Sequence, residues 1–247
     1  MTILVTRPSP NGEQLVSRLS ALGRVAYHAP LIDFAPGGDL ITLPQALLQL
    51  KTGDLVFALS QHAVSYASSV INRAGLQWPA HLSYYAIGRT TALALHHISS
   101  RSVEYPRERE ISEVLLQLPE LQQLAGKQVL IMRGNGGREL LGDTLAERGA
   151  GVSYYECYQR CPIHYDGNEQ SAHWQRAGVD TLIVTSGEML QRLYTLVPDF
   201  YRSSWLLQCH LIVVSERLAT LAQALGWRSI RVADNADNDA LIRATIT

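Results

Sequence analysis

The stretch Ile3-Leu4-Val5-Thr6-Arg7 returns 126 residues later as Val129-Leu130-Ile131-Met132-Arg133. Each run is a short apolar segment that ends at a polar or charged residue, which is typical of a strand followed by a turn. Solenoid repeats have periods of about 20 to 50 residues, so a period this long favours one whole domain that has been duplicated. Two similar domains imply a cleft.

The same register continues at later strand-to-turn junctions. Phe57-Ala58-Leu59-Ser60 matches Ile183-Val184-Thr185-Ser186 at the same spacing, and Ile87–Ala92 matches Val214–Ala219 one residue later. Open α/β sheets bind their ligands beyond the carboxyl ends of the strands. The repeat therefore places the candidate functional residues in these turns.

The composition limits the class of protein. The chain has 247 residues, of which 47% are hydrophobic and 17% charged, and its formal net charge is −1. These values predict a globular protein with no general attraction for nucleic acid. We expect a cytoplasmic protein without a membrane span, because a charge at Arg7 precedes any signal-peptide core and no apolar run approaches the roughly 20 residues that a span needs. The three cysteines, Cys157, Cys161 and Cys209, have the spacing of neither a disulfide framework nor a zinc site.

Short apolar runs alternate with helical patterns along the whole chain. Parallel sheets covered by helices on both faces produce this alternation, so we expect an α/β fold of doubly wound sheets with five strands per repeat, the size of a flavodoxin-like domain. The predicted strands are Ile3–Val5, Val25–Tyr27, Leu55–Leu59, Tyr84–Ile87, Val103–Tyr105, Val129–Met132, Val152–Tyr155, Leu182–Thr185, Leu211–Val214 and Ile230–Val232. Residues 25–34 and 152–161 are long enough in extended form to cross between domains.

Capping residues mark the ends of several predicted helices. The predicted N-terminal caps are Ser9 or Asn11, Ser60, Ser186 and Asp239. Gly23, Gly149 and Gly226 stand where helices should end, because glycine readily adopts the left-handed backbone of a helix C-terminus.

Six junctions, in this order along the chain, carry a strand followed by small or polar residues: Ile3–Val5 followed by Thr6-Arg7-Pro8, Leu59–Val64, Ala86–Ala92, Val129–Arg133 followed by Gly134, Glu156–Arg160 and Val184–Gly187. Together they resemble uroporphyrinogen-III synthase, in its enterobacterial form. The resemblance spans the chain and implies two flavodoxin-like domains that are joined by a two-stranded connector, with the substrate cleft between them.

The resemblance also implies how the chain is divided. One discontinuous domain would comprise residues 1–34 plus 163–247, a second would comprise 36–160, and the connector strands would lie near 29–36 and 156–163. The sequence pattern by itself favours a plain tandem division near Gly126.

The chemistry that the resemblance implies is the cyclisation of linear hydroxymethylbilane to uroporphyrinogen III, with loss of water and inversion of the terminal ring. No cofactor is implied, and we expect a monomer whose one small-molecule partner is this substrate, with a transient handover from the upstream deaminase. The substrate carries eight carboxylates, so its site needs many hydrogen-bond donors. Helix N-termini supply such donors, and small polar residues let a carboxylate approach them.

The candidate substrate-binding residues follow from these junctions. They are Ser60, Gln61, Thr90, Thr91, Gly134, Asn135, Gly136, Ser186 and Gly187. The alternative is that each Ser or Thr only caps its helix. Arg7 and Arg133 occupy equivalent positions after a strand and suit a carboxylate, but each could instead pair with an acidic residue of its own helix, such as Glu13 or Glu139.

Tyr158 is the candidate catalytic residue, because its Tyr-Gln context matches the tyrosine that the family places on the returning connector strand. A phenol is protonated at neutral pH and can give its proton to the departing hydroxyl. The alternative is packing within an aromatic-rich strand. Strand alternation predicts that Tyr154 shares a face with Tyr158 and that Tyr155 lies on the other, which makes Tyr154 the nearest rival.

Other motifs are incomplete. Gly134–Glu139 lacks the third glycine of a dinucleotide site, and the histidines lack metal spacing with carboxylates, so no nucleotide or metal site is predicted. Many relatives of the family repeat a Gly-x-Thr-Thr-Ala turn in the second half, where this chain has Ser215–Ala219, so Leu218 is left out of the site. The alternative function is a two-domain module that closes on a polyanionic small molecule without chemistry.

Overall fold

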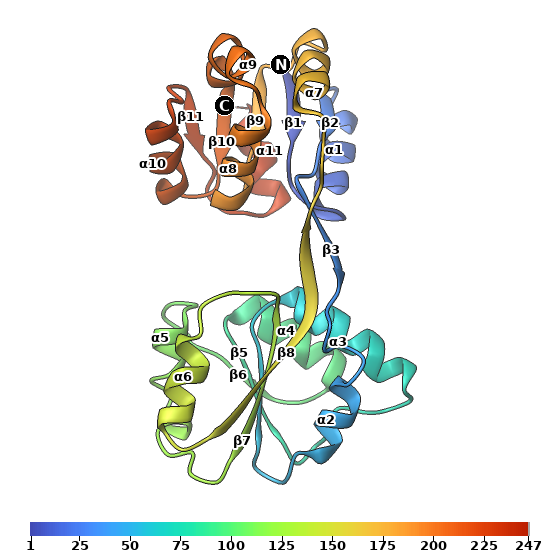
Figure 1. Ribbon diagram of the computed structural model, residues 1–247, viewed down its shortest axis with the longest axis vertical. Helices are drawn as coiled ribbons and strands as arrows, with labels where there is room; N and C mark the ends of the chain where they lie inside the picture. Colours follow the sequence, from blue (N-terminus) through green and yellow to red (C-terminus); the bar gives the residue numbers. More distant parts are fainter. Residues whose placement is uncertain (247) are drawn as a thin grey trace. The chain divides into compact units, whose positions relative to one another are not determined.

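The computed structural model describes residues 1–246 and contains two sheets, each with helices on both faces (Figure 1). The chain divides into two compact units. Unit 1 comprises Met1–Asp33 and the chain from Cys161 onward, and unit 2 comprises Phe34–Arg160.

The sheet of unit 1 has the strand order β11-β10-β9-β1-β2. Its strands are β1 (Thr2–Val5), β2 (Val25–His28), β9 (Thr181–Ile183), β10 (His210–Val213) and β11 (Ile230–Val232), and neighbouring strands run parallel. Numbered within the unit this is the order 2-1-3-4-5, which is the flavodoxin-like arrangement. The helices are α1 (Asn11–Ala21), α7 (Gly167–Arg176), α8 (Gly187–Leu196), α9 (Asp199–Ser204), α10 (Glu216–Leu225) and α11 (Asn238–Ile246).

The sheet of unit 2 has the order β3-β8-β7-β4-β5-β6. Its strands are β3 (Ile32–Pro36), β4 (Leu55–Ala58), β5 (Ser83–Ala86), β6 (Val103–Glu104), β7 (Gln128–Gly134) and β8 (Gly151–Pro162). Figure 1 shows α2 (Leu43–Gln49), α3 (Gln61–Arg73) and α4 (Arg89–Ser99) on one side of this sheet, and α5 (Ser112–Leu115) and α6 (Leu140–Glu147) on the other. Taking β7 and β8 as strands 1 and 2 gives the flavodoxin-like order again, so unit 2 is a circular permutation of unit 1.

Alternation along the strands gives unit 2 two separate cores. Val56 and Ala58 of β4 pack under α2, α3 and α4, whereas Leu55 and Phe57 pack on the other face against residues of α5 and α6. The same alternation divides β7, since Leu130 packs in the first core and adjacent side chains pack in the second.

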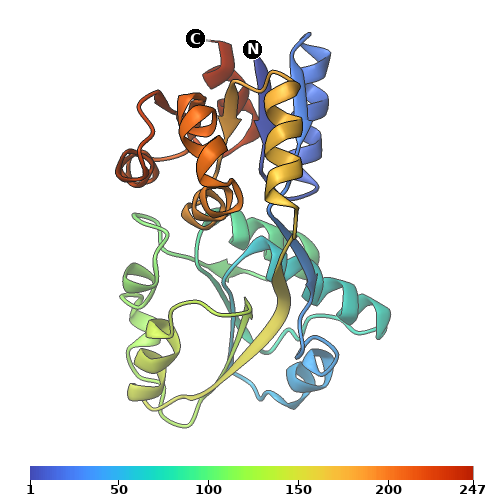
Figure 2. The same cartoon turned by 45° about the horizontal axis from the view of Figure 1, so that its top comes forward.

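The strands β3 and β8 cross the boundary between the units and lie side by side (Figures 1 and 2). The N–H of Gly37 donates to the carbonyl of Cys157, and the N–H of Ile163 donates to the carbonyl of Leu31. Because the partner number rises on one strand as it falls on the other, the two strands run antiparallel.

The tandem division near Gly126 is wrong. β1 pairs with β9 and β4 pairs with β7, so each sheet combines strands from both copies of the repeat. The sequence repeat predicts the positions of the strands correctly. It cannot predict which strands pair, because pairing between strands far apart in the chain has no local sequence pattern.

The ten predicted strands are all present, with ends shifted by at most two residues, except that the strand predicted at Val152–Tyr155 continues to Pro162. The first of the two long segments contains a further strand, β3, and the second forms the single strand β8.

Two of the predicted helix caps are wrong. Neither Ser9 nor Asn11 caps α1, because the Ser9 hydroxyl donates to Glu13 instead and Asn11 is already helical. The last helix is capped by Asp237, whose carboxylate accepts from the N–H of Ala240, and Asp239 lies inside the helix. Ser60 and Ser186 cap α3 and α8 as predicted.

The three predicted glycine stops are present. Gly23, Gly149 and Gly226 have φ values of 74°, 95° and 110°, so each takes the left-handed conformation that ends a helix.

Candidate active site

Most of the predicted site residues lie in unit 2, at one edge of its sheet. Ser60 follows β4, Thr90 and Thr91 follow β5, Gly134 ends β7, and Tyr158 lies in β8. These four strands are neighbours in the order β8-β7-β4-β5 and run parallel, so their carboxyl ends meet at the same edge. Ligands of doubly wound sheets bind at this edge.

Tyr158 and Ser60 are in direct contact there. The Ser60 hydroxyl donates to the Tyr158 phenol oxygen at 3.1 Å. Ser60 is also the N-cap of α3, where its Oγ accepts from the N–H of Ala63 at 3.1 Å. In this arrangement the phenol oxygen accepts a hydrogen bond, and its own proton remains free to be donated elsewhere.

Tyr158 is only 2% exposed, and three rings surround it. Phe34 meets it edge-on at 5.7 Å between centroids, His62 lies tilted at 5.5 Å, and Tyr66 is stacked at 6.1 Å. The Arg160 guanidinium lies 5.9 Å from the ring centroid. The packing interpretation of Tyr158 is therefore correct as far as the ring is concerned.

Gly134 is a glycine because of Tyr158. A Cβ at this position would lie 2.6 Å from Tyr158 Cζ and 3.0 Å from its hydroxyl oxygen, closer than carbon atoms approach. The next residue, Asn135, makes two hydrogen bonds to β8: its N–H donates to the Tyr158 carbonyl, and its side-chain oxygen accepts from the N–H of Arg160. Gly134 and Asn135 thus position the tyrosine through contacts within the protein.

The prediction that Tyr154 shares a face with Tyr158 is wrong. The register of β7 and β8 shifts at Arg133 and Gly134, so that Glu156 faces Arg133 and Tyr158 faces Gly134. One residue of β8 is left over at this bulge, which reverses the alternation. As a result Tyr158 lies in the core under α3 together with Tyr155, while Tyr154 lies on the opposite face.

Arg133 is held on the face of Tyr154. Its side chain is 12% exposed, its guanidinium lies 3.8 Å from the Tyr154 ring centroid, and its Nη2 lies 3.6 Å from a Glu139 carboxylate oxygen. The predicted alternative of an ion pair with Glu139 is therefore observed. Nε and Nη1 are nevertheless buried without a hydrogen-bond partner. Buried donors without a protein partner are rare in folded proteins, so these two nitrogens call for an explanation.

The remaining unit 2 candidates lie at helix starts and in the loop after β7. Gln61 is exposed in the first turn of α3, and Gly136 has a φ of 74° in the loop. Thr90 is exposed and Thr91 is buried in the first turn of α4. Neither threonine caps that helix, because its N-cap is Gly88 and the N–H of Arg89 donates to the Glu110 carboxylate at 2.9 Å. One helix N-terminus of this edge thus already holds a carboxylate.

Three candidates lie in unit 1, after the adjacent parallel strands β1 and β9. Ser186 caps α8 through the N–H of Met189 at 3.2 Å, and Gly187 begins that helix. Arg7 does not pair with Glu13 as the alternative predicted. Its Nη1 donates to the Asn238 side chain at 2.8 Å, and burial lowers its pKa while the nearby Asp237 opposes that shift.

The turn that departs from the family pattern has a structural role. Ser215 caps α10 by accepting from the N–H of Leu218, and the Leu218 side chain is buried in the core.

Within residues 1–246 no group of three His, Cys, Asp or Glu side chains is arranged to hold a metal ion, and no helix there is long and apolar enough to cross a membrane. All three cysteines are free thiols.

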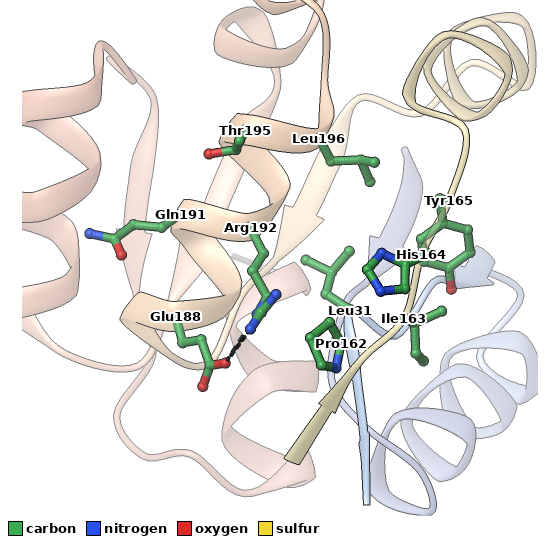
Figure 3. Close-up of a pocket in the computed structure, with 10 residues that line it drawn as sticks. All are labelled: Leu31, Pro162, Ile163, His164, Tyr165, Glu188, Gln191, Arg192, Thr195 and Leu196. Carbon is green, nitrogen blue, oxygen red and sulfur yellow. Dashed lines mark hydrogen bonds and ion pairs between the residues drawn. The ribbon is translucent and has the colours of Figure 1, made fainter. Parts of the chain in front are cut away.

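A pocket of about 480 Å³ lies in unit 1 beside α8, and none of the predicted site residues lines it (Figure 3). Its apolar part is formed by Leu31, Pro162 and Ile163 together with Leu196 of α8, and the same helix contributes Glu188 and Arg192. The two charged side chains pair with each other at 3.0 Å, and the Tyr165 hydroxyl donates to the Pro30 carbonyl. Its charges therefore offer little to an anionic ligand.

The aromatic neighbours of Tyr158 were missed by the sequence analysis. His62 and Tyr66 are four residues apart on α3, the helix that Ser60 caps, so their side chains lie on the same face of that helix. That spacing was visible in the sequence. Phe34 carries no comparable signal, because its contact depends on the pairing of β3 with β8.

Comparisons with known proteins all match the same family, and the matches cover nearly the whole chain. A family model described as "Uroporphyrinogen-III synthase HemD" matches residues 13–243. The uroporphyrinogen-III synthases of Escherichia coli (strain K12) and Salmonella typhimurium are 63% and 64% identical over 244 residues, which is 99% of this chain and 99% of each relative.

Two solved structures share the fold at much lower sequence identity. A mutant uroporphyrinogen III synthase from the extremely thermophilic bacterium Thermus thermophilus has a TM-score of 0.64 at 19% identity, covering 99% of both chains. Uroporphyrinogen-III synthetase from Helicobacter pylori 26695 has a TM-score of 0.58 at 17% identity, covering 99% of this chain and 98% of that one. The permuted pair of flavodoxin-like sheets and the match over nearly every residue lead to the same conclusion: the chain belongs to the uroporphyrinogen-III synthase family.

Proposed function

We propose that this chain converts hydroxymethylbilane to uroporphyrinogen III, with loss of water and inversion of the terminal ring, and that Tyr158 is its general acid. Membership of the family supports the reaction. The contact between Tyr158 and Ser60 supports the role of the tyrosine, and it is the observation that carries the assignment.

The proposed step is a proton transfer to the leaving group. Tyr158 gives its phenol proton to the hydroxymethyl oxygen, the carbon–oxygen bond breaks, and water leaves. The resulting carbocation bonds to the carbon of the terminal ring that already carries the bridge to the preceding ring, and that bridge bond breaks. The released bridge carbon then bonds to the free α-carbon of the same terminal ring, which inverts the ring, and this α-carbon loses a proton that balances the one the tyrosine gave. No electrons are exchanged overall, so the reaction requires no redox cofactor.

Ser60 is suited to support this step. Its hydroxyl donates to the phenol oxygen, and its own oxygen accepts from the first turn of α3. The positive end of the helix is thereby connected to the oxygen that becomes negative as the proton leaves. Hydrogen bonds to a developing charge stabilise the transition state more than the ground state.

Arg133 is the proposed principal cation for a substrate carboxylate in unit 2. Its two unpaired nitrogens can donate without the loss of an existing hydrogen bond. Further hydrogen-bond donors, or positions where a small residue lets a carboxylate come close to the backbone, are proposed at the same sheet edge: Gln61, Thr90, Thr91 and Gly136. In unit 1 the corresponding residues are Arg7, Ser186 and Gly187. We also propose that the protein acts as a cytoplasmic monomer that receives its substrate from the deaminase.

Tyr158→Phe tests the assignment. The substitution keeps the packed ring and removes one hydroxyl, so the protein should fold while turnover of freshly made hydroxymethylbilane falls. General acids contribute about 10²- to 10⁴-fold, and we expect the lower end because the pyrrole nitrogen helps to expel the hydroxyl. Tyr154→Phe, on the opposite face of the sheet, is the matched control. A wild-type rate in Tyr158→Phe would remove the phenol from the mechanism, and absence of turnover in the wild type would favour a binding module.

A further inference from the structure

The imidazole of His62 packs beside Tyr158, although the proposed reaction gives this side chain no role. His62 stands two residues after Ser60, and its ring stacks on Phe34 with 4.0 Å between centroids and 30° between planes. The same imidazole lies 5.5 Å from the Tyr158 ring. It therefore lies against two of the rings of this cluster.

Several neighbours enclose the Tyr158 ring. It is T-shaped to Phe34, stacked with Tyr66 and close to the backbone at Gly134, and Phe34 is in turn stacked on His62. Aromatic pairs have preferred geometries, so a ring enclosed by such pairs has one favoured orientation. If His62 were removed, both Phe34 and Tyr158 would lose a neighbour at once.

The protonation state of His62 suits a stacked ring. Its pKa is lowered by burial and, to a smaller extent, by the charge of Arg160, so the ring is neutral at pH 7. A neutral imidazole packs between aromatic side chains as a flat apolar surface and adds no second positive charge beside Arg160.

We infer that His62 is a positioning residue for Tyr158: by stacking on Phe34 and packing against the tyrosine, it fixes the direction in which the phenol presents its proton. This inference rests on the proposed function, because it concerns the same proton donor. It assigns the effect to the shape of the ring, so a phenyl ring at position 62 should serve nearly as well as the imidazole.

The experiment compares His62→Leu and His62→Phe in the full-length protein. His62→Leu should lower kcat about 2- to 10-fold, the size of one aromatic contact, with little change in KM, and should raise the share of the uninverted isomer that forms spontaneously. His62→Phe should keep both readouts near wild type. An equal loss in both variants would overturn the inference, because it would show that an imidazole nitrogen is required.

A double-mutant cycle separates positioning of Tyr158 from an independent role. In the Tyr158→Phe background the donor is already absent, so adding His62→Leu should lower kcat no further. A second loss of the same size would overturn the inference while leaving the role of Tyr158 intact. Wild-type turnover in Tyr158→Phe alone would instead refute the proposed general acid.

A control accounts for general damage to the unit. Tyr85→Leu breaks the stacked pair of Phe57 and Tyr85, which lies in the core on the opposite face of the same sheet. It should lower the thermal stability without changing the isomer ratio. If it shifts the isomer ratio as His62→Leu does, the effect of His62 is loosened packing and the inference fails.

Discussion

Gly134 sets the space in which the Tyr158 ring can lie. A Cβ there would overlap the ring, so either the strand β7 or the enclosed tyrosine would have to shift. We expect Gly134→Ala to lower the free energy of unfolding by about 1 to 3 kcal/mol, as overpacking does, and to reduce kcat by displacing the phenol.

Gly38→Ala is the control for that substitution. A Cβ at Gly38 meets nothing within 4 Å, so both stability and kcat should stay near wild type. Thermal unfolding and steady-state turnover check the pair. A fully active Gly134→Ala would show that the site tolerates a displaced tyrosine.

Arg133 carries a different prediction, because its nitrogens lack partners. Arg133→Ala should weaken substrate binding by about 1.5 to 3 kcal/mol, the usual contribution of a hydrogen bond to a charged group. Arg138→Ala is the control, since that exposed arginine already pairs with Glu113 at 2.7 Å. KM and product affinity measure the effect. If neither Arg133→Ala nor Arg7→Ala changes affinity, arginine has no part in holding the carboxylates.

His62 also makes stability depend on pH. Its pKa is lower in the folded state than the ordinary value of about 6.5, so below that pH the unfolded chain binds this proton more readily. The free energy of unfolding should therefore fall as the pH drops from about 7.5 to about 5.5. Above this window His62 is neutral in both states, so it no longer makes the stability change with pH.

Denaturant unfolding of the wild type and His62→Gln at both pH values isolates that contribution. The wild type should lose more stability on acidification than the variant, because other histidines, such as His210, act equally in both proteins. Parallel losses would show that the folded protein accommodates a charged His62.

At the scale of an element, β8 shows which features of a strand the sequence predicts and which it does not. Its apolar run predicts a strand, and the family resemblance singles out Tyr158 within it. The bulge opposite Gly134 could not be predicted, because it arises from pairing with β7 and has no signature within β8 itself. A single extra residue moved Tyr154 away from the site and placed Tyr155 on the face of Tyr158.

Helix starts were only partly predictable for a related reason. Serine at Ser60 and Ser186 follows the general capping preference and was interpreted correctly. The start of α4 depends on Glu110, a side chain from a distant loop, which no local pattern indicates. Local preferences were therefore reliable where the partner is a few residues away, and they failed where the partner comes from another part of the chain.

At the scale of the whole molecule, the mixed pairing of the repeat predicts which fragments fold. Residues 34–160 contain β4 to β7 with both cores of unit 2, and nearly all of β8, so this fragment should fold alone. The fragment 1–126, cut where the repeat suggests, leaves β4 without β7 and β1 without β9. Circular dichroism should show cooperative thermal unfolding for the first fragment and none for the second. Cooperative unfolding of both would mean that the repeat halves can also pair within themselves.

The discontinuous unit also has a consequence for synthesis on the ribosome. β1 and β2 are made first, but β1 lies between β2 and β9 in a sheet whose strands β9, β10 and β11 are made last. All of residues 34–160 must be translated in between, which takes roughly ten seconds at bacterial rates of about 5–20 residues per second. Throughout that interval the apolar strand Thr2–Val5 has no native partner on its β9 side. The nascent chain therefore has all the strands of its second unit before it has all those of its first, and its N-terminal strand waits longest for a neighbour.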